Sequence, residues 1–260
     1  MADSSALASA TTLVNQAQHV IVILPPSAQI DTLAAGAGLA ATLLESGKAV
    51  QLACPEKITA PAISGLKNLE TEVGNRNLLI SFPYVESQVD KISYHIGETN
   101  KRFYLTIKPK TNAKPLDMKA VEFAYAGFEA DLLIFVGVKN LDSLAQLYIG
   151  YEDEYKNTAS IALCDQLVEL ASVVLTRDNL SSLSELAFTL LKNAGLSVTA
   201  PAGTDLLSGI DSATDRLRST SVGADTFVAV AELLRSGATR VWKPSRSVIK
   251  KSPKTLWQGK

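Results

Sequence analysis

The chain has 260 residues, of which 47% are hydrophobic and 20% are charged, and its formal net charge is −1. This composition can bury the core of one large α/β domain or two small ones. The apolar runs are too short to cross a bilayer, which excludes a transmembrane segment. Residues 1–18 lack the basic start and apolar stretch of a signal peptide, so we expect a cytoplasmic protein.

Cysteine and histidine are scarce and scattered. Cys54 and Cys164 each stand alone beside an apolar run, and the only histidines are His19 and His95. Isolated cysteines of this kind favour core thiols over a disulfide, which fits a reducing compartment. Because no CxxC or HxxxH spacing occurs, the sequence argues against a zinc site built on these ligands.

Charge is distributed unevenly along the chain. Residues 240–260 contain seven basic residues and no acidic one, whereas the first 239 residues contain 18 basic and 26 acidic residues. We expect an acidic body with a flexible basic tail. The tail would bind RNA or an acidic protein surface, the alternative being a solvated segment without a partner. The candidate contact residues are Lys243, Arg246, Lys250, Lys251 and Lys254.

The first elements in chain order predict a parallel sheet. After an expected helix within 1–18, residues 20–24 form an apolar run that ends at two prolines and is typical of a buried strand. Residues 32–46 are rich in Ala and Leu and predict a helix, and residues 48–54 predict a second strand. A strand, a helix and a strand in succession indicate a βαβ unit, whose ligands bind near the loop 25–31.

An antiparallel segment interrupts this pattern. Apolar and polar residues alternate over 92–96 and 103–107 around a turn at 97–100, which predicts a hairpin with one buried face. Another alternating strand is expected at 121–125. We therefore place an antiparallel insertion at about 82–127.

The second half returns to the parallel pattern. The continuous apolar run 131–138 predicts a central strand, and shorter strands are expected at 160–164 and 173–175. Ser182 and Glu185 have the spacing of a capping box at the start of a helix. Helices are expected at 141–151, 182–193, 201–210 and 224–236. The predicted fold class is α/β, a mainly parallel sheet flanked by helices with an antiparallel hairpin insertion, in one domain over 1–239.

Several of these stretches, taken in order, resemble the DHH phosphoesterase superfamily. Residues 20–50 are similar to its first motif block, 130–138 to its second, and 161–167 stand where its Asp-His-His motif occurs; 173–191 and 227–238 are similar to later blocks. The resemblance covers most of residues 5–239 apart from the insertion. It implies a catalytic centre in which Asp and His hold two manganese or similar ions that activate a water molecule.

Few of the metal ligands that the resemblance implies are present. Only two of these positions keep a suitable residue, Asp31 and Asp165, and two carboxylates cannot hold two metal ions. The remaining positions fall on Pro25, Gln29, Gly137, Gln166, Leu167 and the neighbourhood of Ala213. The resemblance also implies a C-terminal substrate-binding domain in catalytic members, and we expect no counterpart of it in the basic residues after 239.

We therefore expect a non-catalytic DHH-like protein that binds a nucleotide, a nucleic acid or a protein partner without a cofactor; a homo-oligomer is compatible with the sequence. The alternative is a metal-dependent phosphoesterase for short oligonucleotides or cyclic nucleotides. It would hold manganese or magnesium in a rebuilt site of Asp31, Asp165 and either Asp211 or Asp215. A third hypothesis is an unrelated nucleotide-binding α/β module. Asp31 could instead cap the helix that begins at Thr32, and Asp165 could be a turn residue.

Overall fold

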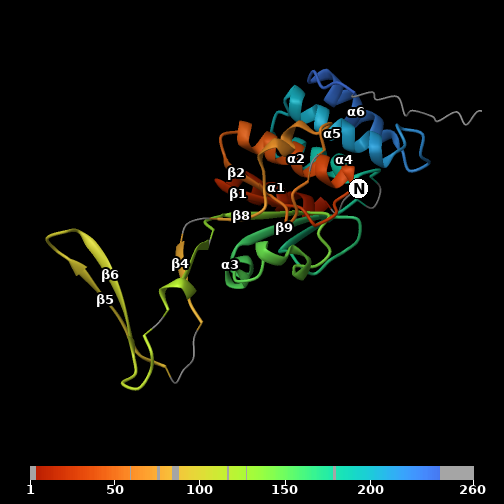
Figure 1. The fold of residues 1–260 in the computed structure, drawn as a ribbon. Coiled ribbons are helices and arrows are strands. Elements are labelled where there is room, and N and C mark those ends of the chain that lie inside the picture. Colours follow the sequence, from red (N-terminus) through yellow and green to blue (C-terminus); the bar gives the residue numbers. More distant parts are fainter. Residues whose placement is uncertain are drawn as a thin grey trace, which may run out of the picture.

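A computed structural model describes residues 4–58, 60–74, 77–83, 88–115, 117–126, 128–177 and 180–240. At its centre lies a six-stranded sheet in which every pair of neighbouring strands is parallel (Figure 1). The strand order is β10-β9-β8-β1-β2-β3. These strands are β1 (His19–Ile23), β2 (Ala49–Ala53), β3 (Leu69–Glu70), β8 (Leu132–Val136), β9 (Ala159–Cys164) and β10 (Val173–Thr176). The predicted α/β fold with a mainly parallel sheet is confirmed.

Helices cover both faces of this sheet. One face carries α1 (Ser4–Gln16), α2 (Ile30–Glu45), η1 (Ser64–Asn68), α4 (Leu183–Asn193), α5 (Ala200–Ala213) and α6 (Ala224–Arg235). The other face carries η3 (Asp142–Leu147) and α3 (Glu152–Asn157). The helix expected at 141–151 is thus a short 3-10 turn, and α3 was not predicted. None of the helices in the described part of the chain is long and apolar enough to span a membrane.

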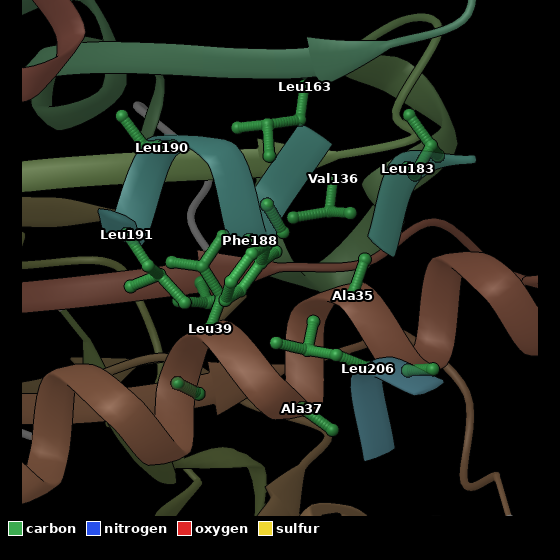
Figure 2. Close-up of a cluster of buried hydrophobic side chains, with 14 of the residues drawn as sticks. Ala35, Ala37, Leu39, Val136, Leu163, Leu183, Phe188, Leu190, Leu191 and Leu206 are labelled. Carbon is green, nitrogen blue, oxygen red and sulfur yellow. The ribbon is translucent and has the colours of Figure 1, made fainter. Parts of the chain in front are cut away.

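The central strands are buried on both faces, which explains their unbroken apolar sequence. In β8, Ile134 and Val136 face the core under α2 and α4, whereas Leu133 and Phe135 face the core under η3 and α3. Figure 2 shows Val136 of β8 among side chains of α2 and α4. A strand with cores on both sides needs apolar residues at every position rather than at alternate ones.

Two glycines allow α2 to lie close to its neighbours. A Cβ atom on Gly36 would come within 2.5 Å of the Leu24 side chain, and one on Gly38 within 2.5 Å of the Leu206 side chain. The Gly36–Gly38 pair therefore serves helix packing. The two cysteines, Cys54 and Cys164, are buried and free, so the prediction of core thiols is also confirmed.

The antiparallel insertion forms two small sheets. Strand β4 (Asn77–Ser81) pairs with β7 (Glu122–Ala126), and β5 (Val89–Gly97) pairs with β6 (Arg102–Pro109). The antiparallel segment therefore begins at β4, a few residues before 82. We call the β5–β6 hairpin the arm; it extends away from the α/β body (Figure 1). The prediction that one of its faces is buried is wrong for the described chain, because side chains on both faces are exposed.

The basic tail lies almost entirely outside the described residues. Arg240 is the last residue that the structure describes, and its guanidinium pairs with the carboxylate of Asp211 near the end of α5. The backbone N–H of Thr239 donates to Thr204 Oγ1 at 3.0 Å. The candidate residues Lys243, Arg246, Lys250, Lys251 and Lys254 lie beyond the described residues, so their role stays a prediction.

Candidate functional site

The chain reverses its direction of winding between β1 and β8. From β1 it continues to β2 and β3 on one side, and from β8 to β9 and β10 on the other. Parallel sheets bind ligands at such a switch point, outside the carboxyl ends of the strands. A pocket of about 340 Å³ lies there, lined by residues that follow β1, β8 and β9, together with Thr32 and Leu183. We call it the strand-end pocket; its volume suits one small ligand.

Asp31, at this end of the sheet, caps a helix far away in the sequence. Its two carboxylate oxygens accept the backbone N–H groups of Leu183 at 2.8 Å and Ser184 at 3.0 Å. These are the first residues of α4, whose free N–H groups need acceptors and favour a negative charge. Burial raises the pKa of Asp31, and these hydrogen bonds oppose that shift only in part.

The prediction that Asp31 caps its own helix is therefore wrong, because its carboxylate caps α4 instead. Asp31 is the second residue of α2, and the N-cap of α2 is Gln29, whose side chain makes no capping hydrogen bond. A capping role was expected within the same helix, but the side chain is directed across to α4. The signal that could have indicated this, a second helix starting nearby in space, is not local in the sequence.

Asp165 follows β9 and forms an ion pair. Its carboxylate lies 2.8 Å from Nε of Arg177, the residue after β10, and about half of the Asp165 side chain is exposed. Strands β9 and β10 are parallel neighbours, so residues just beyond their carboxyl ends lie close together. Arg177 was not singled out from the sequence, although it comes two residues after an expected strand.

The other aspartates of the rebuilt-site alternative are also engaged. Asp211 accepts two hydrogen bonds from the Arg240 guanidinium, and Asp215 lies 2.8 Å from Arg218. Across the part of the chain that the structure describes, no three Asp, Glu, His or Cys side chains are arranged to hold a metal ion. A site for two metal ions needs several such ligands per ion, so the residues around the pocket do not fit it.

Gly137, which matches the position of the second-block aspartate, has no room for a side chain. Its φ angle is +70°, a conformation that side-chain-bearing residues rarely adopt. A Cβ atom there would lie 2.8 Å from Thr32 Cγ2. Both the backbone conformation and the contact with α2 therefore require glycine at this end of β8.

The pocket carries positive charge beside these engaged carboxylates. Lys139 lines the pocket and is exposed, and no carboxylate of the described chain is paired with it. Asn140, also in the wall, accepts the N–H of Ser143 with its side-chain oxygen, so this bond does not use the donors of its amide NH₂ group. The N-terminus of helix α2 lies at the wall of the pocket, and its partial positive charge adds to the charge of Lys139.

The predicted capping box belongs to the framework of the site. Ser182 Oγ accepts the backbone N–H of Glu185 at 3.0 Å, as expected. The Glu185 carboxylate accepts instead from Ser181, through its N–H at 2.8 Å and its hydroxyl, and from Thr226 of α6. The bond from the Glu185 side chain thus goes to Ser181, one residue before the expected Ser182. The same side chain joins the start of α4 to α6.

Comparison with known proteins gives a result at the level of the fold. No protein-family model and no curated protein matches the chain. Among solved structures, an exopolyphosphatase-related protein from Bacteroides fragilis matches with a TM-score of 0.61 and 13% sequence identity, over 92% of this chain. The chain therefore shares the α/β fold of that structure. It spans 58% of the length of that structural neighbour, and the low identity restricts the likeness to the fold.

Proposed function

We propose that this protein is a non-catalytic member of the phosphoesterase-like fold, which binds a phosphate-bearing ligand of the nucleotide class in the strand-end pocket. One observation carries the proposal. Asp31 and Asp165, the two positions that match metal ligands of the DHH superfamily, are both engaged by partners within the protein. Asp31 accepts the first N–H groups of α4, and Asp165 pairs with Arg177.

Metal binding would have to break these interactions. If Asp31 turned to a cation, two buried N–H groups of α4 would lose their acceptor, at about 1–3 kcal/mol for each unsatisfied group. If Asp165 turned to a cation, the guanidinium of Arg177 would be left beside that cation and would repel it. Lys139 lines the pocket together with Asp165, and its positive charge would repel a cation there as well. These terms all oppose a divalent ion.

The same charges favour a phosphate. Lysine and arginine bind phosphate oxygens through charge-assisted hydrogen bonds, and the start of a helix adds backbone N–H donors. Lys139, the Asn140 amide and the first turn of α2 face one pocket from different elements. Its volume of about 340 Å³ accommodates a nucleotide and is too small for a folded macromolecule. The pocket therefore supports the nucleotide class more strongly than a protein partner.

Titration calorimetry in the presence of a metal chelator tests the proposal. The probes are adenosine monophosphate, a dinucleotide and inorganic tripolyphosphate. We expect binding of at least one nucleotide without metal, and Lys139→Ala should weaken it about tenfold, which corresponds to one charged hydrogen bond. The matched control is Lys156→Ala in α3, an exposed lysine outside the pocket lining, which should leave the affinity unchanged.

A hydrolysis assay separates this proposal from the phosphoesterase alternative. Short oligonucleotides and cyclic dinucleotides are incubated with manganese, magnesium or cobalt, and the metal content of the purified protein is measured. We expect neither turnover nor a tightly bound transition metal. Metal-dependent turnover that Asp165→Asn abolishes would overturn the proposal and establish a rebuilt catalytic site.

A further inference from the structure

The arm carries a continuous apolar face. Strands β5 and β6 pair in a register that places Ile92 opposite Ile107, Tyr94 opposite Leu105 and Ile96 opposite Phe103. Because every second residue of a strand points to the same side, these three cross-strand pairs share one face of the hairpin. We call these six residues the arm face. The rings of Tyr94 and Phe103 are stacked across it, 5.4 Å apart.

This face is open to solvent in the single chain. Five of its six side chains are between 44% and 70% exposed, and Ile107 is half-buried. Their exposed area is roughly 600 Å², given the 150–250 Å² of a large aromatic side chain. Contiguous apolar patches of this size mark interaction sites. An isolated two-stranded ribbon is also only marginally stable in water, so the arm gains stability from a covering partner.

The chemistry of the two faces restricts what that partner can be. Lys91, Arg102 and Lys108 lie on the opposite face of the arm, around the stacked rings of His95 and Tyr104. The arm face itself contains no charged residue. A nucleic acid or an acidic protein would bind the basic face and leave the apolar one exposed, so the partner of the arm face is itself apolar.

We propose that the arm face binds the arm face of a second copy of this chain. The two-fold axis would lie in the plane between the two ribbons, perpendicular to the strands and level with the central pair, Tyr94 and Leu105. It would place the ribbons face to face and antiparallel. The all-aliphatic pair of one copy, Ile92 and Ile107, then packs on the pair that contains Phe103 in the other copy. Small side chains meet large ones at both ends, as sheet-on-sheet packing and a closed two-fold interface require.

The available area agrees with a dimer. Each copy would contribute roughly 600 Å², close to the ~800 Å² per partner of a standard stable interface. The face is apolar throughout, like the core of a homodimer interface. Because the arm projects from the α/β body, two arms can meet without disturbing the strand-end pocket (Figure 1). This inference is independent of the proposed function.

Sedimentation velocity of the full chain, from low to high micromolar concentration, tests the proposal with a pair of neighbouring substitutions. Leu105→Lys places a charge on the arm face, and Thr106→Lys places the same charge on the opposite face of the same strand. We expect a concentration-dependent dimer that Leu105→Lys weakens by about 100-fold or more, because two unpaired lysines would be buried per dimer. Thr106→Lys should leave the dimer intact.

Cross-linking gives a second measurement that does not depend on a destabilising charge. Leu105→Cys lies next to the proposed axis, so a short bis-maleimide should join two copies, whereas Thr106→Cys should stay uncoupled. The natural cysteines are buried and will react little. A wild-type chain that is monomeric at every concentration, or a dimer that both lysine variants retain, would overturn the proposal. Binding of the arm face to a different protein, with the chain itself monomeric, would overturn it as well.

Discussion

The carboxylate of Asp31 in α2 accepts the backbone N–H of Leu183 in α4 at 2.8 Å, across 152 residues of sequence. Ser184 donates a second backbone hydrogen bond to the same side chain, and its hydroxyl donates to the Asp31 carbonyl oxygen. Asp31, the position that the resemblance to DHH proteins matches to a metal ligand, thus joins two helices here. The fold itself depends on this aspartate.

Removal of this cap should destabilise the protein. We expect Asp31→Ala to lower the free energy of unfolding by about 1–3 kcal/mol, because two buried N–H groups lose their acceptor. Asp165→Ala should cost less than about 1 kcal/mol, since its ion pair with Arg177 is half-exposed. Denaturant unfolding of both variants measures the difference. Equal effects of the two substitutions would contradict the assignment of Asp31 as a structural cap.

Asp31 should also give stability a characteristic pH dependence. Burial raises its pKa in the folded state above the ordinary value of 3.8. Between these two pKa values the folded state holds a proton that the unfolded state has lost, so stability falls as the pH rises through this window. Asp31→Asn does not titrate. The stability of the wild type relative to Asp31→Asn should therefore decline with rising pH and then level off above the folded pKa.

Asp131 provides a control, because its pKa is shifted in the opposite direction. Its carboxylate accepts the backbone N–H groups of Gln18 and His19, and these bonds lower its pKa. A lowered pKa gives stability that is present above the ordinary value and is lost as the pH falls through the folded pKa. Relative to Asp131→Asn, the wild type should thus gain stability with rising pH. If the stability relative to the Asn variant changed with pH in the same direction for both aspartates, their environments would not be as described.

The fold was more accessible to sequence reasoning than the site. The parallel strands are predictable because burial on both faces imposes apolar residues at every position, as in β8. The partner of Asp31 is not predictable in this way, because helix propensity and capping rules act over a few residues. Lys139 directly follows one expected strand and Arg177 comes two residues after another, so the rule that ligands bind at strand ends could have identified them. The alternation in the arm correctly indicated a hairpin, but alternation cannot show what covers the apolar face.

Gly137, the glycine in the pocket lining, should be costly to replace. A Cβ atom there combines the cost of a positive φ angle with a contact of 2.8 Å to Thr32 Cγ2. Gly150 has a φ angle of +89° and nothing within 4 Å, so Gly150→Ala reports the backbone cost alone. We expect about 1 kcal/mol for Gly150→Ala and at least about 2 kcal/mol for Gly137→Ala, measured by denaturant unfolding.

The contact between Gly137 and Thr32 can be tested separately. Thr32→Ser removes the Cγ2 atom and should recover part of the loss in Gly137→Ala, but none of the loss in Gly150→Ala. If Thr32→Ser does not help Gly137→Ala, the steric part of the argument is wrong. The cost of Gly137→Ala would then come from the positive φ angle alone.

The final prediction concerns the basic tail. Deletion of residues 243–260 keeps the contacts of Thr239 and Arg240 with α5, so we expect the melting temperature to change by less than about 2 °C. The deletion also removes six of the seven bases in residues 240–260, which would neutralise phosphates and release counterions. Retention of RNA or heparin by the full chain should fall steeply with salt, and the truncated chain should lose this retention. If the truncated chain unfolds, the tail is a packed element; if the full chain shows no salt-sensitive retention, the tail does not bind polyanions.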